Sequence, residues 1–344
     1  MVVSVLKTMN SNTEKIWGAL LHFGYNMWSD IPVERPDKKV PSYAKNFPFA
    51  AREMRFDYGL WKEATEKMAA GGMNMVVVDV GEGLRYPSHP ELAVEGSWTP
   101  ERMAEEVARL KAIGIEAIPK LNFSTSHDTW LGEYQRMVST EEYYRVCRDV
   151  IRDTYEAFCR PRLFHLGYDE EAVELQRPYD LVVVRQGELW WHDFEFFVKT
   201  VEGLGMRPWI WSDFIWKHQS EFLARMPRSV LQSNWYYYDE FDPEKVPGGR
   251  WREHNQRCIR AYEVLEKAGF DQVPCMSNCR AQGGDNNIPN TVSHCSRVIA
   301  PERLKGFLVA PWARTQEEKR ERIMGAIDKT VAAMKECRGA ERGN

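Results

Sequence analysis

Phe164-His165-Leu166-Gly167-Tyr168-Asp169-Glu170-Glu171 is an apolar strand that runs directly into three consecutive carboxylates. Crowded like charges raise one another's pKa, and such arrangements are typical of sites where a carboxyl group must stay protonated to act as a general acid. The competing interpretation is a solvated acidic loop that leads into a helix N-terminus, where acidic residues favour the helix dipole. The remainder of the chain distinguishes the two interpretations.

The composition indicates one large globular domain. The chain has 344 residues, 43% of them hydrophobic, and no apolar run long enough to cross a bilayer, so no membrane partner is expected. We expect a single domain over residues 1–344, with a barrel at about 16–337 and an N-terminal extension at 1–15. The net charge is -4 and the Lys and Arg residues are scattered, which argues against a nucleic-acid partner.

The aromatic and cysteine contents narrow the function class. With 13 Trp, 14 Tyr and 15 Phe, the chain has more aromatic residues than a core of this size needs, and surplus Trp often lines sites that stack on sugar rings. Seven Cys without a regular framework argue against a disulfide scaffold. Residues 1–15 carry no signal-peptide pattern, so we expect a reducing compartment such as the cytoplasm, or export with the signal already removed.

Apolar runs alternate regularly with amphipathic segments. The helical segment at 99–114, for example, opens with Thr99-Pro100-Glu101-Arg102 and closes at Gly114. Further helices are expected at 50–70, at about 140–158 with Ser139 or Thr140 as the cap, and at 193–204. Eight strand-helix pairs without a leftover domain predict a (β/α)8 TIM barrel. A doubly wound sheet would need a Gly-rich phosphate turn after its first strand, which Gly24-Tyr25-Asn26 does not supply. The predicted strands lie within 16–28, 73–80, 115–123, 164–171, 207–214, 230–238, 272–277 and 304–312.

Polar and aromatic residues follow the predicted strands, where a barrel places its active site. Three Trp from well-separated parts of the chain would meet at one mouth with carboxylates between them, which favours a sugar site. The candidates are His22, Asn26, Asp79, Glu82, Arg85, Asn122, His127, Asp169, Glu170, Trp211, Asp213, Asn234, Trp235, Tyr236, Asn278 and Trp312.

Several motifs, in the same order along one barrel, resemble glycoside hydrolase family 20, the β-N-acetylhexosaminidases. His165-Leu166-Gly167-Tyr168-Asp169-Glu170 looks like the family's His-x-Gly-Gly-Asp-Glu signature, with Tyr168 in place of the second Gly. Residues 73–96 look like the second-strand region of the family. Residues 115–119 are similar to the strand that leads to a terminal His, here His127. Trp211-Ser212-Asp213 and residues 306–312 match the fifth-strand and eighth-strand patterns.

The resemblance implies the roles of the site residues. We expect no cofactor and no metal. Glu170 would be the general acid and then the base, and Asp169 would orient the substrate's 2-acetamido group, whose carbonyl oxygen attacks the anomeric carbon. His127 would hydrogen-bond near the acid pair. The other implied substrate contacts are the acetamido-pocket wall of Trp211, Trp235 and Trp312, a hydroxyl donor among Tyr236, Tyr237 and Tyr238, and His165.

The chain also departs from the family pattern. The first strand ends with His22 and Asn26 instead of an Arg, and Lys120 and Asn122 stand where two acids are usual. Arg314 follows Trp312 where a sugar-binding Glu is expected, and Asn278 replaces the Tyr-x-Asp of the seventh strand. We therefore expect the same reaction class with an altered glycone: a galacto-configured, modified or charged sugar. Arg314 and Lys120 are candidates to meet a negative group, with surface or packing cations as the alternative.

Other signals are weaker. Cys275, Cys279, His294 and Cys295 have the ligand types of a zinc site, but their irregular spacing favours buried free thiols. Gly283-Gly284-Asp285-Asn286-Asn287 is interpreted as a flexible loop, and Glu171 and Glu174 as the charged start of the segment after the site. The apolar stretch 179–191 would fold over the mouth as a lid or pack against a second subunit, giving a possible homodimer.

The sequence therefore predicts a retaining, substrate-assisted glycosidase that removes terminal 2-acetamido sugars from glycans. Two alternatives stay open. The first is a carbohydrate-binding barrel without catalysis, since several hydroxyl ligands of the family are missing. The second is a glycosidase that uses two separate carboxylates, for instance Asp213 or Asp239 with Glu170, on a sugar without an acetamido group.

Overall fold

The structure is a computed structural model that describes residues 15–28, 49–176, 179, 181–279 and 285–343. The expected N-terminal extension lies outside these residues apart from Lys15, and so do Gly283 and Gly284 of the expected flexible loop. None of the described helices combines the length and the apolar character needed to span a bilayer.

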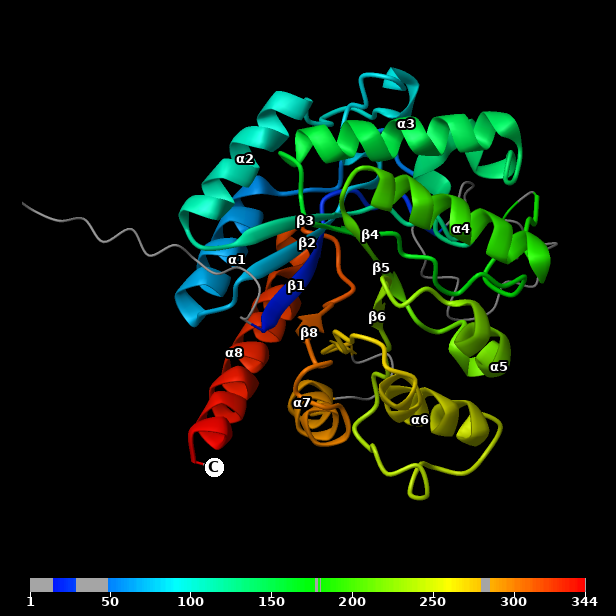
Figure 1. The fold of residues 1–344 in the computed structure, drawn as a ribbon. Helices are drawn as coiled ribbons and strands as arrows, with labels where there is room; N and C mark the ends of the chain where they lie inside the picture. The colour runs from blue at the N-terminus through cyan, green and yellow to red at the C-terminus, as the bar shows by residue number, and fades with distance from the viewer. Residues whose placement is uncertain (1–14, 29–48, 177–178, 180, 280–284, 344) are drawn as a thin grey trace, which may run out of the picture.

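Eight parallel strands form the barrel at the centre of Figure 1. They pair in the order β6-β5-β4-β3-β2-β1-β8-β7. Parallel bridges between residues 232 and 272 and between 235 and 275 join β6 to β7, which closes the ring. The single-domain (β/α)8 barrel is thus confirmed. The strands are β1 Ile16–His22, β2 Met75–Asp79, β3 Glu116–Lys120, β4 Leu163–His165, β5 Arg207–Trp211, β6 Leu231–Ser233, β7 Cys275–Met276 and β8 Gly306–Val309.

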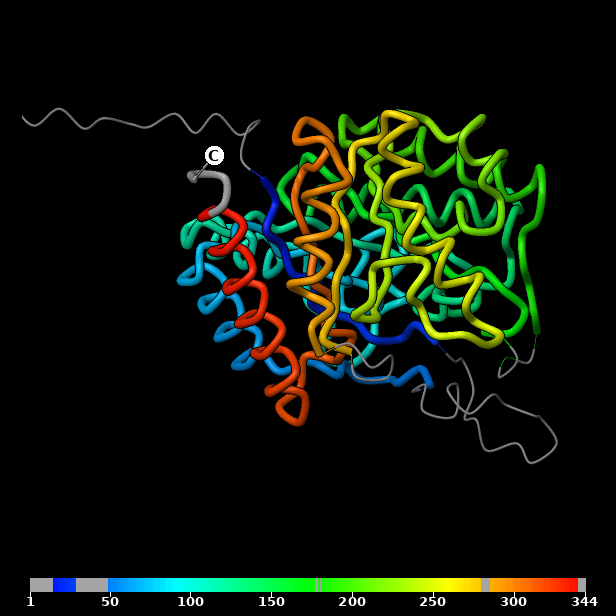
Figure 2. Tube along the Cα trace, turned by 90° about the horizontal axis from the view of Figure 1, so that it is seen from below, coloured from blue at the N-terminus to red at the C-terminus, as the bar shows by residue number. Residues whose placement is uncertain are grey.

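In the described part of the chain, eight α-helices surround the strands in chain order (Figure 1). Viewed from below, α1 lies beside α8, so the first and last helices complete the outer ring (Figure 2). The helices are α1 Tyr58–Gly71, α2 Pro100–Ala112, α3 Glu141–Ala157, α4 Glu188–Gly203, α5 Ile215–Arg225, α6 Arg252–Lys267, α7 Asn287–Val298 and α8 Arg320–Gly343.

Helix ends follow the local capping chemistry. Thr99 and Thr140 cap α2 and α3 as the sequence predicts, each accepting a backbone N–H through its side chain. The expected helix start near residue 50 is wrong, because Asp57 caps α1 by accepting the Leu60 N–H at 3.0 Å. Helix α4 begins at Glu188 instead of 193, so Trp190 and Trp191 of the expected lid belong to a buried helix face.

Each strand buries both faces, as parallel strands covered by helices do. In β1, Leu20 points into the barrel interior, whereas Ala19 and Leu21 pack against the helices. Trp209 and Trp211 of β5 both point inward, so large rings fill the barrel below its mouth. This packed interior is the rigid base on which the strand-end residues are held.

Candidate active site

The turn after β4 presents the two acids in a strained backbone. Gly167, Tyr168 and Glu170 have φ of 68°, 69° and 54°, values that non-glycine residues adopt at a cost of roughly 1–3 kcal/mol. Trp312, at the end of β8, has φ of 48°. Strained non-glycine residues cluster at functional sites, and three of them lie here at the carboxyl ends of β4 and β8.

Gly167→Ala is expected to destabilise the protein by about 1–3 kcal/mol. A Cβ at residue 167 would lie 2.2 Å from Oδ1 of Asn122 and 2.8 Å from its Cα, in addition to the backbone strain at φ 68°. Urea unfolding measures the effect. Gly114→Ala is the matched control, because its φ is 83° but nothing lies within 4 Å of the added Cβ. Equal losses in both variants would contradict a packing role for Gly167.

His127 lies beside both acids. Its Nε2 is 3.2 Å from Oε2 of Glu170 and 3.7 Å from Oδ2 of Asp169. Burial alone would lower the pKa of His127, but the two carboxylates outweigh burial and raise it. Asp169 and His127 are buried, whereas the Glu170 side chain is 39% exposed. The exposed carboxyl group is therefore the one that can reach a bound substrate and solvent.

Asn122 fixes the orientation of Asp169. Its amide nitrogen donates to Oδ1 of Asp169 at 2.7 Å, while its amide oxygen accepts the N–H groups of Tyr168 and Ser124 at 3.1 Å. Burial raises the pKa of Asp169 and the nearby Glu170 charge raises it further, against the effect of His127. Asn122, just after β3, thus supports the acid pair that follows the neighbouring strand β4.

Asp213, after β5, holds the turn from the other side. Its Oδ2 accepts the backbone N–H of Glu170 at 2.9 Å, and its buried Oδ1 has no hydrogen-bond partner among the described residues. Burial raises the pKa of Asp213, and the charge of Asp169 adds to this effect. A carboxyl group in this position favours the protonated state and is a poor nucleophile.

Lys120, Asp79 and His22 form a buried polar group at the carboxyl ends of β3, β2 and β1. Lys120 Nζ is 2.6 Å from Oδ2 of Asp79, and His22 Nδ1 is 3.2 Å from the same oxygen. Burial alone would raise the pKa of Asp79, but Lys120 and His22 outweigh it and lower the pKa to about 2. Lys120 is fully buried and its charge is paired with Asp79, so this cation stabilises the carboxylate within the barrel.

Aromatic rings line the mouth between the strand ends. Trp211 and Trp312 have ring centroids 5.8 Å apart, and Trp235 stacks on Tyr237 at 5.1 Å. His165 is fully buried, and its ring centroid lies 4.5 Å from that of Trp211. The Nε1 of Trp211 is buried and has no hydrogen-bond partner among the described residues.

Of the candidate hydroxyl donors among residues 236–238, Tyr237 is the one that packs with the barrel interior. Tyr237 packs with the barrel interior, 6.4 Å from Trp312 between ring centroids. Tyr236, the residue selected from the sequence, faces outward and packs against Phe241 at 5.2 Å. Side chains alternate along a strand, so Trp235 and Tyr237 share one face and Tyr236 takes the other. Applying this alternation to residues 235–237 could have identified Tyr237.

The other predicted contacts have partners away from the acid pair. Glu82 accepts the N–H groups of Tyr25 and Asn26, and the Asn26 side chain bonds the backbone of Ala51 in both directions. Among the remaining predicted contacts, Arg85 is exposed, the Asn278 side chain donates to the Arg322 carbonyl, and Nε of Arg314 donates to Glu318 at 2.8 Å. A substrate role for these five residues stays a prediction.

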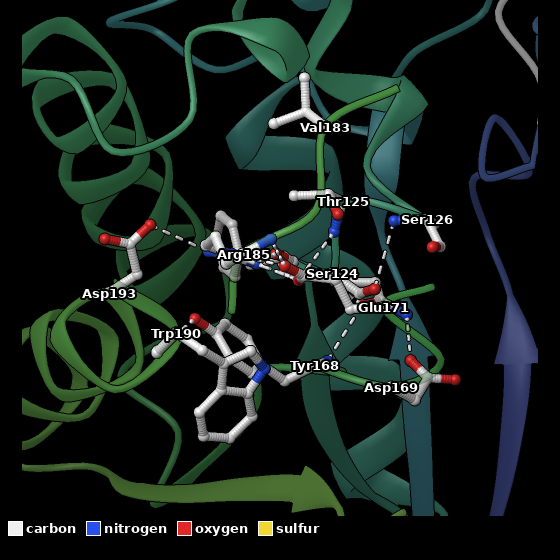
Figure 3. A network of polar contacts seen from close by, with 12 residues as sticks. Ser124, Thr125, Ser126, Tyr168, Asp169, Glu171, Val183, Arg185, Trp190 and Asp193 are labelled. Atoms are coloured by element: carbon white, nitrogen blue, oxygen red, sulfur yellow. Dashed lines mark hydrogen bonds and ion pairs between the residues drawn. The ribbon is translucent and has the colours of Figure 1, made fainter. Parts of the chain in front are cut away.

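Glu171, expected as the charged start of the segment after the site, belongs to a buried ion network. Arg185 donates from Nη2 to Glu171 Oε2 at 2.6 Å and from Nη1 to Asp193 Oδ2 at 3.2 Å (Figure 3). Its guanidinium carbon is 4.7 Å from the ring centroid of Tyr168. The network ties the active-site turn to the segment before α4. The sequence signal was a lone Arg in an apolar stretch, 14 residues after the acids.

Part of the stretch 179–191, expected as a lid, is held against the protein by hydrogen bonds. Tyr179 is buried and donates to the Ser126 carbonyl at 3.1 Å, and the Gln176 side chain bonds the backbone of Val183 in both directions. Leu181 and Val182, between these anchors, are 54% and 43% exposed. Contact with a second subunit stays a prediction for these two residues.

We expect the carboxyl group of Asp128 to make the free energy of unfolding fall as the pH rises. Both of its carboxylate oxygens are buried without a hydrogen-bond partner among the described residues, and burial raises its pKa from 3.8 to about 7. The folded state therefore holds this proton more tightly, so its contribution to stability is lost as pH rises through about 7. Urea unfolding at pH 5 and pH 8 should show wild type losing stability relative to Asp128→Asn. Parallel changes would contradict this.

The described residues include side chains of the types that bind metal ions. Within the described ranges, one group of three ligand residues, His127, Asp169 and Glu170, has ligand atoms within 4.8 Å of one another. Cys275, Cys279, His294 and Cys295 are all described and do not form such a group. Cys275 Sγ instead lies 3.5 Å from the Tyr237 hydroxyl.

Comparison with known proteins supports the fold assignment. No protein-family model matches the chain, and no curated protein matches it. An exo-β-N-acetylglucosaminidase of glycoside hydrolase family 20 from Vibrio harveyi superposes with a TM-score of 0.61 at 12% identity, covering 93% of this chain and 54% of that one. A β-N-acetylhexosaminidase from Bacteroides fragilis gives 0.58 at 13% identity, covering 93% and 65%. Dispersin B gives 0.56 at 11% identity, covering 81% and 95%.

The chain thus has the barrel fold of the family-20 structures, at low sequence identity. It spans about half of the Vibrio chain and just under two thirds of the Bacteroides chain. Similarity at this level shows the fold alone.

Proposed function

We propose that the protein is a glycoside hydrolase of the β-N-acetylhexosaminidase type, which removes terminal 2-acetamido sugars from glycans by substrate-assisted catalysis. The observation that carries the proposal is the constellation of His127, Asn122, Asp169 and Glu170 after the neighbouring strands β3 and β4. Two structures with the same barrel fold are named as an exo-β-N-acetylglucosaminidase and a β-N-acetylhexosaminidase, which supports this reaction class.

In the first step, the substrate's own acetamido carbonyl oxygen attacks the anomeric carbon. Asp169, held by Asn122, accepts the acetamido N–H and stabilises the positive charge that develops on that group. Glu170 gives its proton to the glycosidic oxygen, the bond between that oxygen and the anomeric carbon breaks, and the aglycone leaves as an alcohol. The product on the sugar is a cyclic oxazolinium.

In the second step, Glu170 is a carboxylate and takes a proton from water, which attacks the anomeric carbon. The oxazolinium ring opens, the acetamido group is restored and the configuration is retained. His127, 3.2 Å from Glu170, supports both protonation states of that residue by donating or accepting at Oε2. The Trp walls exclude other water, so that internal attack competes well in the first step.

Asp213 argues against a mechanism with two separate carboxylates. A nucleophile must be ionised, but burial and the Asp169 charge raise the pKa of Asp213. Its Oδ2 is also occupied by the Glu170 backbone N–H. Its proposed role is to hold Glu170 in its strained conformation.

Tyr237 is proposed to donate its hydroxyl to the acetamido oxygen. Tyr237→Phe should lower kcat/KM on an acetamido sugar by about tenfold, since a hydrogen bond to a group that gains charge is worth about 1.5 kcal/mol. The measurement is steady-state hydrolysis of a chromogenic glycoside. Tyr236→Phe is the matched control because Tyr236 faces outward. An equal loss in the two variants would remove Tyr237 from this role.

The proposal is tested by the hydrolysis of chromogenic glycosides. The panel contains the β-N-acetylglucosaminide, the β-N-acetylgalactosaminide, the β-glucoside and the β-galactoside. Turnover confined to the acetamido sugars is expected, and the better of the two identifies the glycone. Equal turnover of sugars with and without the acetamido group would favour a two-carboxylate glycosidase. No turnover of any member would favour a barrel that only binds carbohydrate.

A further inference from the structure

A continuous row of aromatic rings leads from the proposed sugar pocket to the protein surface. Trp235 lies at the pocket wall, and its ring centroid is 4.5 Å from that of Trp216, the second residue of α5. Trp216 is 5.2 Å from His254, and His254 is 5.8 Å from Trp251. We call Trp235, Trp216, His254 and Trp251 the aromatic row. It crosses the carboxyl-end side of β5 and β6 and ends at the start of α6.

The outer end of this row is open to solvent. Trp251 is 56% exposed, the largest exposed fraction among the large hydrophobic side chains described, so packing does not account for its position. Trp216, within the row, is only 8% exposed, and its Nε1 donates to Oδ1 of Asn234 at 2.8 Å, which holds this ring in place. A row with a fixed ring inside it and an exposed ring at its outer end suits stacking on a flexible, polar partner.

Polar side chains accompany the rings. Arg250 lies over Trp251, with its guanidinium carbon 5.1 Å from the ring centroid. A cavity of about 490 Å³ between α5 and α6 is lined by Trp216, Lys217 and Arg257. These helices are neighbours in the outer ring (Figure 1). Donors beside aromatic faces are the combination that binds sugar hydroxyls and ring faces together.

His254 connects this surface to the acid. Burial lowers the pKa of His254, as do the charges of Lys217 and Arg257, while the Glu170 carboxylate acts in the opposite direction. Hydrogen bonds give the same placement, because Asp213 accepts the Glu170 N–H at Oδ2 at 2.9 Å and its carbonyl accepts the Trp216 N–H at 3.0 Å. The row is thus linked through Asp213 to the turn that carries Glu170.

We propose that the aromatic row and the adjoining α5–α6 cavity bind the aglycone, as a chain of further sugar residues attached to the terminal sugar in the pocket. The inference rests on the proposed function, because it takes the barrel mouth as the position of the terminal sugar. The substrate class it names is an oligosaccharide with several sugars on the leaving side of the scissile bond. A short or purely hydrophobic aglycone would leave Trp251 without a partner.

The kinetic test compares two substrates on three proteins. The substrates are the chromogenic β-N-acetylglucosaminide and the β-1,4-linked tetramer of N-acetylglucosamine. In Trp251→Ala, the ratio of kcat/KM on the tetramer to kcat/KM on the chromogenic glycoside should fall by about three- to tenfold, mainly through KM. Tyr58→Ala is the control, because Tyr58 is 38% exposed on α1 and should leave the ratio unchanged. An unchanged ratio in Trp251→Ala would overturn the proposal.

A binding series separates this inference from the proposed function. Calorimetric titration of Glu170→Gln with N-acetylglucosamine oligomers of one to four units should show affinity rising with length. When Trp251→Ala is added, the gain in affinity from one unit to four units should be smaller by about three- to tenfold. Failure of wild type to hydrolyse any glycoside would reject the proposed function but leave this series decisive. Equal affinity for one and four units, or no binding of the tetramer, would overturn the aromatic row as an aglycone site.

Discussion

Glu170→Gln is expected to lower kcat on a disaccharide substrate by about 10²- to 10⁴-fold, the range that a general acid contributes. The amide is close in size to the carboxyl group, so the hydrogen bond with His127 can persist while the transferable proton is lost. The loss should be smaller on a nitrophenyl glycoside, because an acidic phenol leaves without full protonation. Both rates can be measured on the same preparation with product quantified by chromatography.

Glu174→Gln is the control for this substitution. Glu174 lies four residues further along, is exposed and has no part in the site, so the same chemical change there should leave kcat unaltered. A disaccharide rate in Glu170→Gln within threefold of wild type would show that Glu170 is not the general acid.

Arg185→Leu is expected to destabilise the protein by about 3–5 kcal/mol, the cost of breaking a buried ion pair by removing one partner. Glu171 and Asp193 are 5% and 0% exposed, and the substitution leaves both without their cation. Arg185 also donates to the Phe123 carbonyl at 2.6 Å and lies over the Tyr168 ring, so the turn that carries the acids loses a support. Urea unfolding measures the stability.

The comparison for Arg185 is Arg145→Leu on α3. Arg145 and Glu142 form a salt bridge with side chains 53% and 46% exposed, and such surface pairs contribute about 0–1 kcal/mol. A difference of less than 1 kcal/mol between the two variants would contradict the view that the Arg185 network stabilises the active-site turn.

The barrel could be predicted because its signals are local. Each strand is a short apolar run, each helix has a cap or an amphipathic face, and the eight pairs follow one another without interruption. The acid pair was found for the same reason, since Asp169 and Glu170 are adjacent and end a buried strand. His127 was found through the family resemblance, and in the structure its Nε2 lies 3.2 Å from Glu170.

The polar contacts between distant segments could not be predicted. The ion pair of Glu171 could not be predicted because its partner Arg185 stands 14 residues away, beyond an irregular segment. Glu82 follows β2, but its carboxylate turns to the backbone N–H groups of Tyr25 and Asn26, 56 to 57 residues earlier. Such pairings depend on how loops meet above the barrel, and no periodicity in the sequence encodes that geometry.

The central claim is that the substrate's acetamido group is the nucleophile, oriented by Asp169. The most direct measurement is calorimetric binding of a bicyclic thiazoline analogue of the acetamido sugar, which resembles the oxazolinium intermediate. Wild type should bind it at least about 10²-fold more tightly than the parent sugar, and Asp169→Asn should lose most of that advantage. Equal affinities of wild type for the thiazoline and the parent sugar would contradict substrate-assisted catalysis in this barrel.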